Sequence, residues 1–275
     1  MSGGAGREPV SGADVRVDQW SEGVLRATID RPEVRNAYRS RTAVELARVV
    51  EEFDRDDEQR VLVLTGAGGA FCSGGDLSSA HEVEQAHEQQ LGHARVMREG
   101  MHRVIRALEV CDKPVVAMVS GPAVAGGLAL ALACDLRVAD TTARLGDTSG
   151  RVGLLPDEGG AWLAARAMGT DRALRMIWGA EVYDAPRALD LGLLTEVVEP
   201  ERLEDVVLEL ARRLATTAPL TTKVVKRMVR HAEHQTLGQA LHEAELAVSI
   251  VNDTDDVREG VTAFLEKRQP RFRGR

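Results

Sequence analysis

The stretch PVVAMVSGPAVAGGLALALACDLRVAD, residues 114–140, decides the fold. It begins with an aliphatic run typical of a buried strand and turns at Gly121 and Pro122. It continues as an apolar segment of helical character, and a second strand-like run follows over residues 135–140. A strand, a helix and a strand in this order predict parallel strands joined by a crossover helix. The sequence therefore favours an α/β fold.

The same pattern occurs earlier in the chain. Strand-like runs at residues 24–30 and 60–66 flank an amphipathic helical pattern at 41–58, and a long polar helical pattern covers 81–108. After Pro200 the patterns are helical, over residues 201–217, 220–233, 237–252 and 256–268. We expect a mobile tail at 1–18, an α/β core at 19–199 and a C-terminal helical region at 200–275.

Composition narrows the possible functions. The 275 residues carry a net charge of −8 with acidic and basic residues interspersed, and only 3% are aromatic, which argues against a nucleic-acid-binding protein. The three cysteines form no CxxC pair, so we expect no metal site and a reducing, cytoplasmic location. The polar N-terminus does not read as a signal peptide, and the longest apolar stretch is too short to span a membrane.

Two glycine-rich turns each follow a predicted strand and lead towards a helix. They are TGAGGAFCSGGDL at 65–77 and VSGPAVAGGLALALACD at 119–135. Glycine lets backbone N–H groups approach a ligand, and a helix N-terminus adds a positive dipole end. Neither turn has the pattern of a phosphate-binding loop. For either turn taken alone, the pattern favours tight packing of a strand against a helix over a binding role.

A third motif, GLLPDEGGAW at 153–162, carries two adjacent carboxylates, Asp157 and Glu158, where a helix is expected to start. An aspartate at such a position often caps the helix by accepting backbone N–H bonds. Spacing alone favours this capping role over a catalytic one.

Together these motifs resemble the enoyl-CoA hydratase/isomerase family, the crotonases. The resemblance also includes IDRPEVRNAY at 29–38, ALDLGLLTEVVEP at 188–200 and FLEKRQPRF at 264–272, so it covers nearly the whole chain. It implies a crotonase-like β-β-α spiral core and C-terminal helices that build homotrimers, often paired as hexamers. It also implies an acyl-CoA thioester as the substrate, with no cofactor besides the coenzyme A that the substrate carries.

The resemblance assigns roles to individual residues. The backbone N–H groups of Gly75 and Gly126 would bind the thioester oxygen, and preorganised donors of this kind stabilise an enolate by roughly 3 to 4 kcal/mol each. Phe264 and Lys267 would reach the nucleotide end of coenzyme A from a neighbouring subunit, although Lys267 also reads as an ordinary solvated lysine. The residues expected to line the coenzyme A channel are Arg35, Ala37, Ser73, Gly74, Asp76 and Leu77.

Two departures from the family pattern shape the functional prediction. Hydratases of the family hold water between two glutamates, and ungapped counting places Ala129 and Ser149 at those positions. Neither can act as a base near neutral pH, and Asp147 is displaced by two residues. The hydration mechanism is therefore expected to be absent.

The carboxylate after the proline is the alternative catalytic group. In isomerase branches of the family an acidic residue at the Asp157 position shuttles a proton between carbons of the acyl chain, and GLLPDEGGAW resembles the branch associated with phenylacetate catabolism. The resemblance favours Asp157 as acid/base, with Glu158 in reserve. Three hypotheses stay open: an acyl-CoA isomerase, a hydratase or other crotonase enzyme relying on Asp147 or on water held by Ser149, and a noncatalytic acyl-CoA-binding protein. The sequence does not identify the acyl group, whose pocket we expect residues 77–101 to line.

Overall fold

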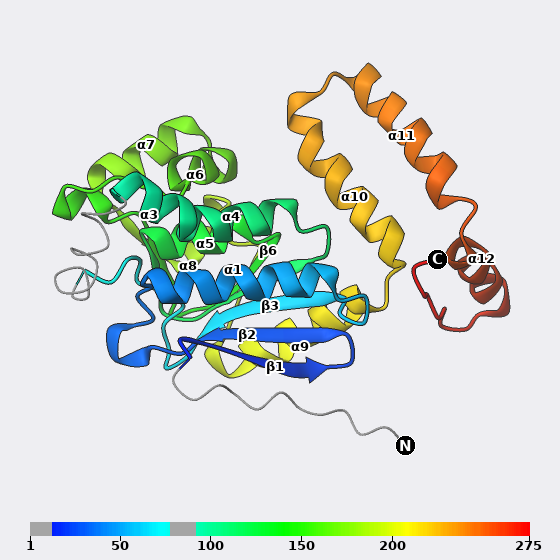
Figure 1. The fold of residues 1–275 in the computed structure, drawn as a ribbon, viewed down its shortest axis with the longest axis horizontal. Coiled ribbons are helices and arrows are strands. Elements are labelled where there is room, and N and C mark those ends of the chain that lie inside the picture. Colours follow the sequence, from blue (N-terminus) through cyan, green and yellow to red (C-terminus); the bar gives the residue numbers. More distant parts are fainter. Residues whose placement is uncertain (1–12, 78–91) are drawn as a thin grey trace.

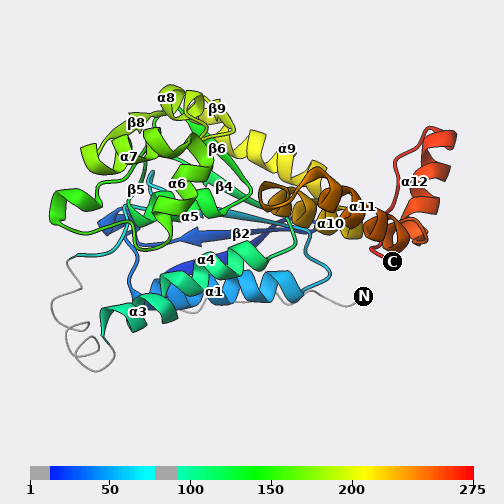
Figure 2. The same cartoon turned by 90° about the horizontal axis from the view of Figure 1, so that it is seen from above.

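The computed structural model describes residues 13–77 and 92–275. Most of the chain forms a layered α/β core, and a helical arm extends from it (Figures 1 and 2). The strands are β1 Val15–Ser21, β2 Val24–Ile29, β3 Val61–Gly66, β4 Val115–Val119, β5 Pro122–Val124, β6 Leu136–Asp140, β7 Arg144–Gly146, β8 Val182–Asp184 and β9 Glu196–Val198. The helices are α1 Ser40–Arg55, α3 His93–Glu99, α4 Met101–Val110, α5 Gly126–Ala133, α6 Gly160–Met168, α7 Thr170–Gly179, α8 Ala185–Asp190, α9 Leu203–Ala215, α10 Pro219–His231, α11 Leu237–Val251 and α12 Asp255–Glu266.

The strands form two sheets. The larger has the order β1-β2-β3-β4-β6-β9 and is parallel except for the antiparallel β1–β2 pair. The smaller has the order β5-β7-β8. Strands β2 and β3, which α1 connects, pair in parallel as the sequence predicted. Strands β4 and β6, with α5 between them in the chain, form the second predicted unit.

Side chains that alternate along the strands fill two hydrophobic layers. Val61 and Val63 of β3 pack with Leu203 and Val207 of α9 on one face of the large sheet. The residues between them point to the main core, which α1, α4 and α5 cover from the other face. Helix α9 therefore belongs to the core, although the sequence boundary at residue 200 placed it in the C-terminal region.

Two further sequence expectations need correction. The range 1–18 assigned to a tail includes the start of β1, where Val15 is buried and pairs with Ile29; residues 1–12 lie outside the described part. In the described part of the stretch at 81–108, the single predicted helix is two helices, because Gly100 leaves helical geometry (φ −96°, ψ −110°).

Helices α10, α11 and α12 form the arm that projects from one end of the core (Figures 1 and 2). Cationic side chains of α10 attach it to the core: Lys226 and Arg230 both bind the Asp135 carboxylate, at 2.7 and 2.9 Å. No described helix is long and apolar enough to cross a bilayer.

Candidate active site

The two glycine-rich turns meet at the N-terminus of α5. Cys72 forms an isolated parallel bridge with Ala123, and Phe71 and Cys72 donate backbone hydrogen bonds to the Pro122 carbonyl at 3.0 and 2.9 Å. A Cβ built on Gly74 would lie 3.5 Å from the backbone nitrogen of Gly126. Pairing between these loops thus brings together turns that are separate in the sequence.

Gly75 and Gly126 each present a backbone N–H at this junction. Neither N–H donates to an acceptor within residues 13–77 and 92–275. Gly126 is the first residue of α5, where N–H groups lack intrahelical partners and the helix dipole favours negative charge. Two donors of this kind can bind the oxygen of a thioester and the negative charge that develops on it.

Glu158 supplies a carboxylate next to Gly126. A Cβ built on Gly126 would overlap Glu158 Oε1 and lie 2.7 Å from the Tyr38 hydroxyl, so both side chains lie directly against this glycine. The Tyr38 hydroxyl donates a hydrogen bond to Oε1, whereas buried Oε2 has no partner in the described part of the chain. Glu158 is buried, with only 5% of its surface exposed.

Burial raises the pKa of Glu158 to about 7. The Tyr38 hydrogen bond opposes this rise, and the neighbouring Asp157 carboxylate adds to it. A carboxyl group with this pKa is divided between its acid and base forms near neutral pH, as a group that both takes up and returns a proton requires.

Asp157 occupies a different environment from Glu158. Its residue is exposed, and its backbone carbonyl lies 2.7 Å from Nε2 of His102. Helix α6 begins at Gly160 with Gly159, not Asp157, as its N-cap, so Asp157 lies outside the capping position. The capping role that spacing favoured is therefore wrong.

The positions that the resemblance assigns to the hydratase glutamates are buried. Ala129 lies on α5, and its Cβ is 3.6 Å from a Cβ built on Gly160 at the start of α6. Ser149 is also buried, and its N–H donates to Asp147 Oδ1 at 2.9 Å. Asp147 is thereby tied to its own turn.

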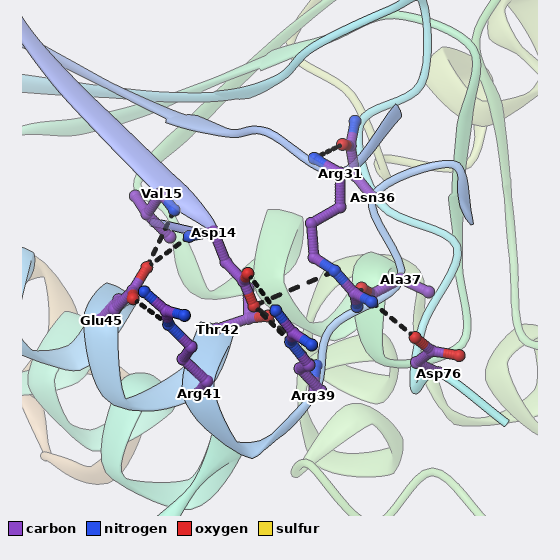
Figure 3. A network of polar contacts seen from close by, with 10 residues as sticks. All are labelled: Asp14, Val15, Arg31, Asn36, Ala37, Arg39, Arg41, Thr42, Glu45 and Asp76. Carbon is purple, nitrogen blue, oxygen red and sulfur yellow. Dashed lines mark hydrogen bonds and ion pairs between the residues drawn. The ribbon is translucent and has the colours of Figure 1, made fainter. Parts of the chain in front are cut away.

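A buried ion-pair network supports the loop that carries Gly75 (Figure 3). The Arg31 guanidinium donates to Asp76 Oδ2 at 2.8 Å and to the Ala37 carbonyl at 2.5 Å. Asp14 binds Arg39 and also lies 3.9 Å from Arg31. The side chains of Asp76 and Ala37 are buried in this network, and their predicted contacts with coenzyme A stay predictions.

The other predicted substrate contacts fall into two groups. Near the site, the Ser73 hydroxyl donates to the Val34 carbonyl and the Ser73 backbone N–H donates to the Arg35 carbonyl. Leu77 is exposed. By contrast, α12 carries Phe264 on the arm, away from α5, and Lys267 follows at its end (Figures 1 and 2). Within one chain these two residues do not join the site. Most of the stretch at 77–101 expected to line the acyl pocket lies outside the described residues.

Sequence reasoning missed Tyr38 and Arg31 as site residues. Both belong to the stretch IDRPEVRNAY, which contributed to the resemblance, but nothing local to either residue indicates its partner. Their partners are Glu158 and Asp76, which lie far along the chain.

The raised pKa of Glu158 predicts a pH-dependent stability difference. Because the folded state holds this proton up to about pH 7 and the unfolded chain releases it near pH 4.5, the stabilising contribution of protonated Glu158 is lost as pH rises between these values. Glu158→Gln removes the titration, so its free energy of unfolding should rise relative to wild type between pH 4.5 and 7.5, by on the order of 3 kcal/mol. Urea unfolding across this range measures the difference.

Glu181 provides a control because its pKa is shifted in the direction opposite to that of Glu158. It also accepts a tyrosine hydrogen bond, at 2.6 Å from Tyr183, but lies near the surface with a lowered pKa, first because of that bond. Glu181→Gln should therefore not reproduce the gain. A Glu158→Gln difference that stays flat with pH would show that Glu158 is not buried as an acid.

Comparisons with known proteins agree with this architecture. A model of the family described as enoyl-CoA hydratase/isomerase matches residues 19–275. The 1,2-epoxyphenylacetyl-CoA isomerase of Escherichia coli strain K12 is 34% identical over 254 residues, covering 92% of this chain and 96% of that protein. A short-chain-enoyl-CoA hydratase of Clostridium acetobutylicum is 33% identical over 247 residues, covering 90% and 92%.

The solved structures confirm the predicted crotonase-like fold. The crystal structure of an enoyl-CoA hydratase from Bacillus anthracis has a TM-score of 0.89 and 28% identity, with 95% of this chain and 100% of that chain covered. A putative enoyl-CoA hydratase/isomerase from Mycobacterium abscessus has a TM-score of 0.88 and 32% identity, with 95% and 100% covered. By its sequence and by its fold, the chain belongs to the enoyl-CoA hydratase/isomerase family.

Proposed function

We propose that this protein is an acyl-CoA isomerase that moves a proton, and with it a double bond, along the acyl chain. The observation that carries the proposal is the buried Glu158 carboxylate against Gly126, at the junction of two backbone N–H groups that have no acceptor among the described residues. The N–H groups of Gly75 and Gly126 bind the thioester oxygen, and Glu158 is the acid/base.

The reaction needs one carboxylate and no water. Glu158 removes a proton from the carbon next to the thioester of a 3-enoyl-CoA, and the electron pair moves onto the thioester oxygen to give a conjugated enolate. Gly75 and Gly126 stabilise the negative charge. Protonated Glu158 then returns the proton two carbons away, and the charge on oxygen collapses to give the 2-enoyl-CoA.

Two observations favour isomerisation over hydration. Ala129 and Ser149 stand where the resemblance places the two hydratase glutamates, so the pair of bases that would hold water is missing from those positions. The E. coli relative at 34% identity is itself an isomerase of an acyl-CoA. The hydratase among the relatives keeps hydration as the competing hypothesis.

A labelling experiment tests the proposal. The protein is incubated with a panel of 3-enoyl-CoA thioesters in deuterated water and, separately, in ¹⁸O-enriched water, and the products are analysed by mass spectrometry. We expect 2-enoyl-CoA that lacks ¹⁸O. A 3-hydroxyacyl-CoA product containing ¹⁸O would instead establish hydration, and thioester binding without turnover across the panel would establish the noncatalytic alternative.

We also propose that the arm assembles the protein into a homotrimer or a dimer of trimers. Helix α11 exposes Leu241 and Leu246 at 57% and 58%, and α10 exposes Val225 at 50%. Exposed aliphatic rows on neighbouring helices are typical of a subunit interface. Assembly would also bring Phe264 and Lys267 of one chain to a neighbour's site.

Light scattering coupled to size exclusion checks this prediction. We expect a mass about three or six times the chain mass of 29.8 kDa. Leu241→Glu should shift the protein towards the monomer, whereas Val44→Glu, at an exposed aliphatic position of α1, should leave the mass unchanged. A wild-type protein that remains monomeric at micromolar concentration would contradict the proposal.

A further inference from the structure

Tyr38 lies between the two loops of the site. Its N–H donates to the Gly74 carbonyl at 2.9 Å, and its carbonyl accepts from the N–H of Asp76 at 2.8 Å. The hydroxyl is 3.7 Å from a Cβ built on Gly75 and 2.7 Å from one built on Gly126. The loop that presents one proposed oxyanion donor therefore also fixes the position of this ring.

The hydroxyl distinguishes the two oxygens of Glu158. Oε1 accepts the Tyr38 hydrogen bond, and Oε2 is buried with no partner among the described residues. A carboxylate oxygen that already accepts a strong hydrogen bond is the weaker proton acceptor of the two, and an unpartnered buried oxygen retains its full capacity to bind a proton.

Resting on the proposed function, we propose that Tyr38 is a positioning residue that holds Oε1 of Glu158 and thereby makes Oε2 the oxygen that carries the proton between substrate carbons. Tyr38 need not touch the reacting atoms. Its hydroxyl fixes the orientation of the carboxylate relative to Gly126 and stabilises the charged form of Glu158.

The groups facing Glu158 support this role. Tyr38 and Cys72 approach it from loops packed against it, Asp157 lies in its own turn, and α5 contributes Gly126, which bears no side chain. Desolvation and the proximity of Glu158 raise the pKa of Tyr38 well above 10, so the hydroxyl stays a donor over the working pH range. Burial likewise raises the pKa of Cys72 to about 12, so Cys72 stays neutral. The Tyr38 hydrogen bond is thus the largest stabilising influence on a carboxylate that burial and Asp157 both disfavour, and a backbone hydrogen bond adds to it.

Tyr38→Phe tests the proposal because it removes the hydroxyl and keeps the ring. Loss of a buried hydrogen bond to a charged group should raise the pKa of Glu158 by about one to two pH units. From a starting value near 7, kcat/KM at pH 7 should fall roughly five- to fiftyfold and recover substantially by pH 9.5. A purely structural role would lower activity equally at every pH.

Tyr183→Phe is the matched control, because Tyr183 is the other of the chain's two tyrosines and also donates to a glutamate, Glu181. It should leave the pH profile unchanged. Adding Tyr38→Phe to a Glu158→Gln protein should cause no further pH-dependent loss, since the group through which Tyr38 acts is already absent.

A second readout keeps this proposal separate from the proposed function. Carbon-13 NMR of the substrate-free protein follows the Glu158 carboxyl, assigned by its disappearance in Glu158→Gln. We expect the Tyr38→Phe titration at higher pH than wild type even if no tested thioester turns over. An unchanged Glu158 titration in a folded Tyr38→Phe protein would overturn the role of Tyr38 and leave the isomerase proposal standing.

Discussion

Gly126→Val is expected to leave a folded protein whose turnover is lower by roughly a thousandfold or more. The side chain would enter the space now filled by Glu158 Oε1 and by the ring edge and hydroxyl of Tyr38, so both side chains must shift to admit it. The proposed base is then displaced and the thioester crowded away from the N–H groups. Removing one oxyanion donor typically costs a factor of a hundred to a thousand, and losing an aligned base adds to it.

Gly238→Val separates this local effect from a general effect of valine at the start of a helix. Gly238 lies in the first turn of α11, and within the described part of the chain the nearest atom to its built Cβ is the Thr236 hydroxyl oxygen, at 4.0 Å. This control should retain turnover. Steady-state kinetics and circular dichroism on both variants check the prediction, and equal turnover by a folded Gly126→Val protein would rule out the proposed site.

Glu158→Gln should lower kcat by a factor of about a hundred to ten thousand and preserve thioester binding. Glutamine keeps the size of the side chain and an acceptor for the Tyr38 hydroxyl, but it is not a base. Calorimetric titration with a non-reactive acyl-CoA measures binding, and single-turnover kinetics measure the chemical step. A loss confined to the chemical step is the expected result.

Asp157→Asn is the variant that distinguishes the two carboxylates, because Asp157 is the residue that family resemblance favoured as acid/base. In the structure Asp157 is exposed, and its carboxylate contributes to the raised pKa of Glu158. Neutralising it should therefore lower the pKa of Glu158 and move the pH optimum to lower values. The loss of turnover should be smaller than in Glu158→Gln. If Asp157→Asn instead abolishes turnover and Glu158→Gln does not, the acid/base role belongs to Asp157.

The family and most of the core could be predicted from local sequence patterns. The aliphatic runs of β3 and β4, the amphipathic pattern of α1 and the glycine turn before α5 each involve neighbouring residues, so contiguous sequence determines them. The break at Gly100 could not be predicted, since a single glycine is tolerated within many helices. The start of β1 was missed because its pairing with β2 defines it more clearly than its own polar sequence.

What the sequence by itself determined is the order of the elements, the two turns that present Gly75 and Gly126, and the presence of two carboxylates after Pro156. Which carboxylate is buried was decided only by the tertiary structure. Asp157 and Glu158 are adjacent and chemically alike, and spacing assigns neither to the interior. Glu158 is buried because it packs against Gly126 and binds Tyr38, which is 120 residues away in the sequence. Burial and proton affinity depend on such contacts, and these exist only once the chain has folded.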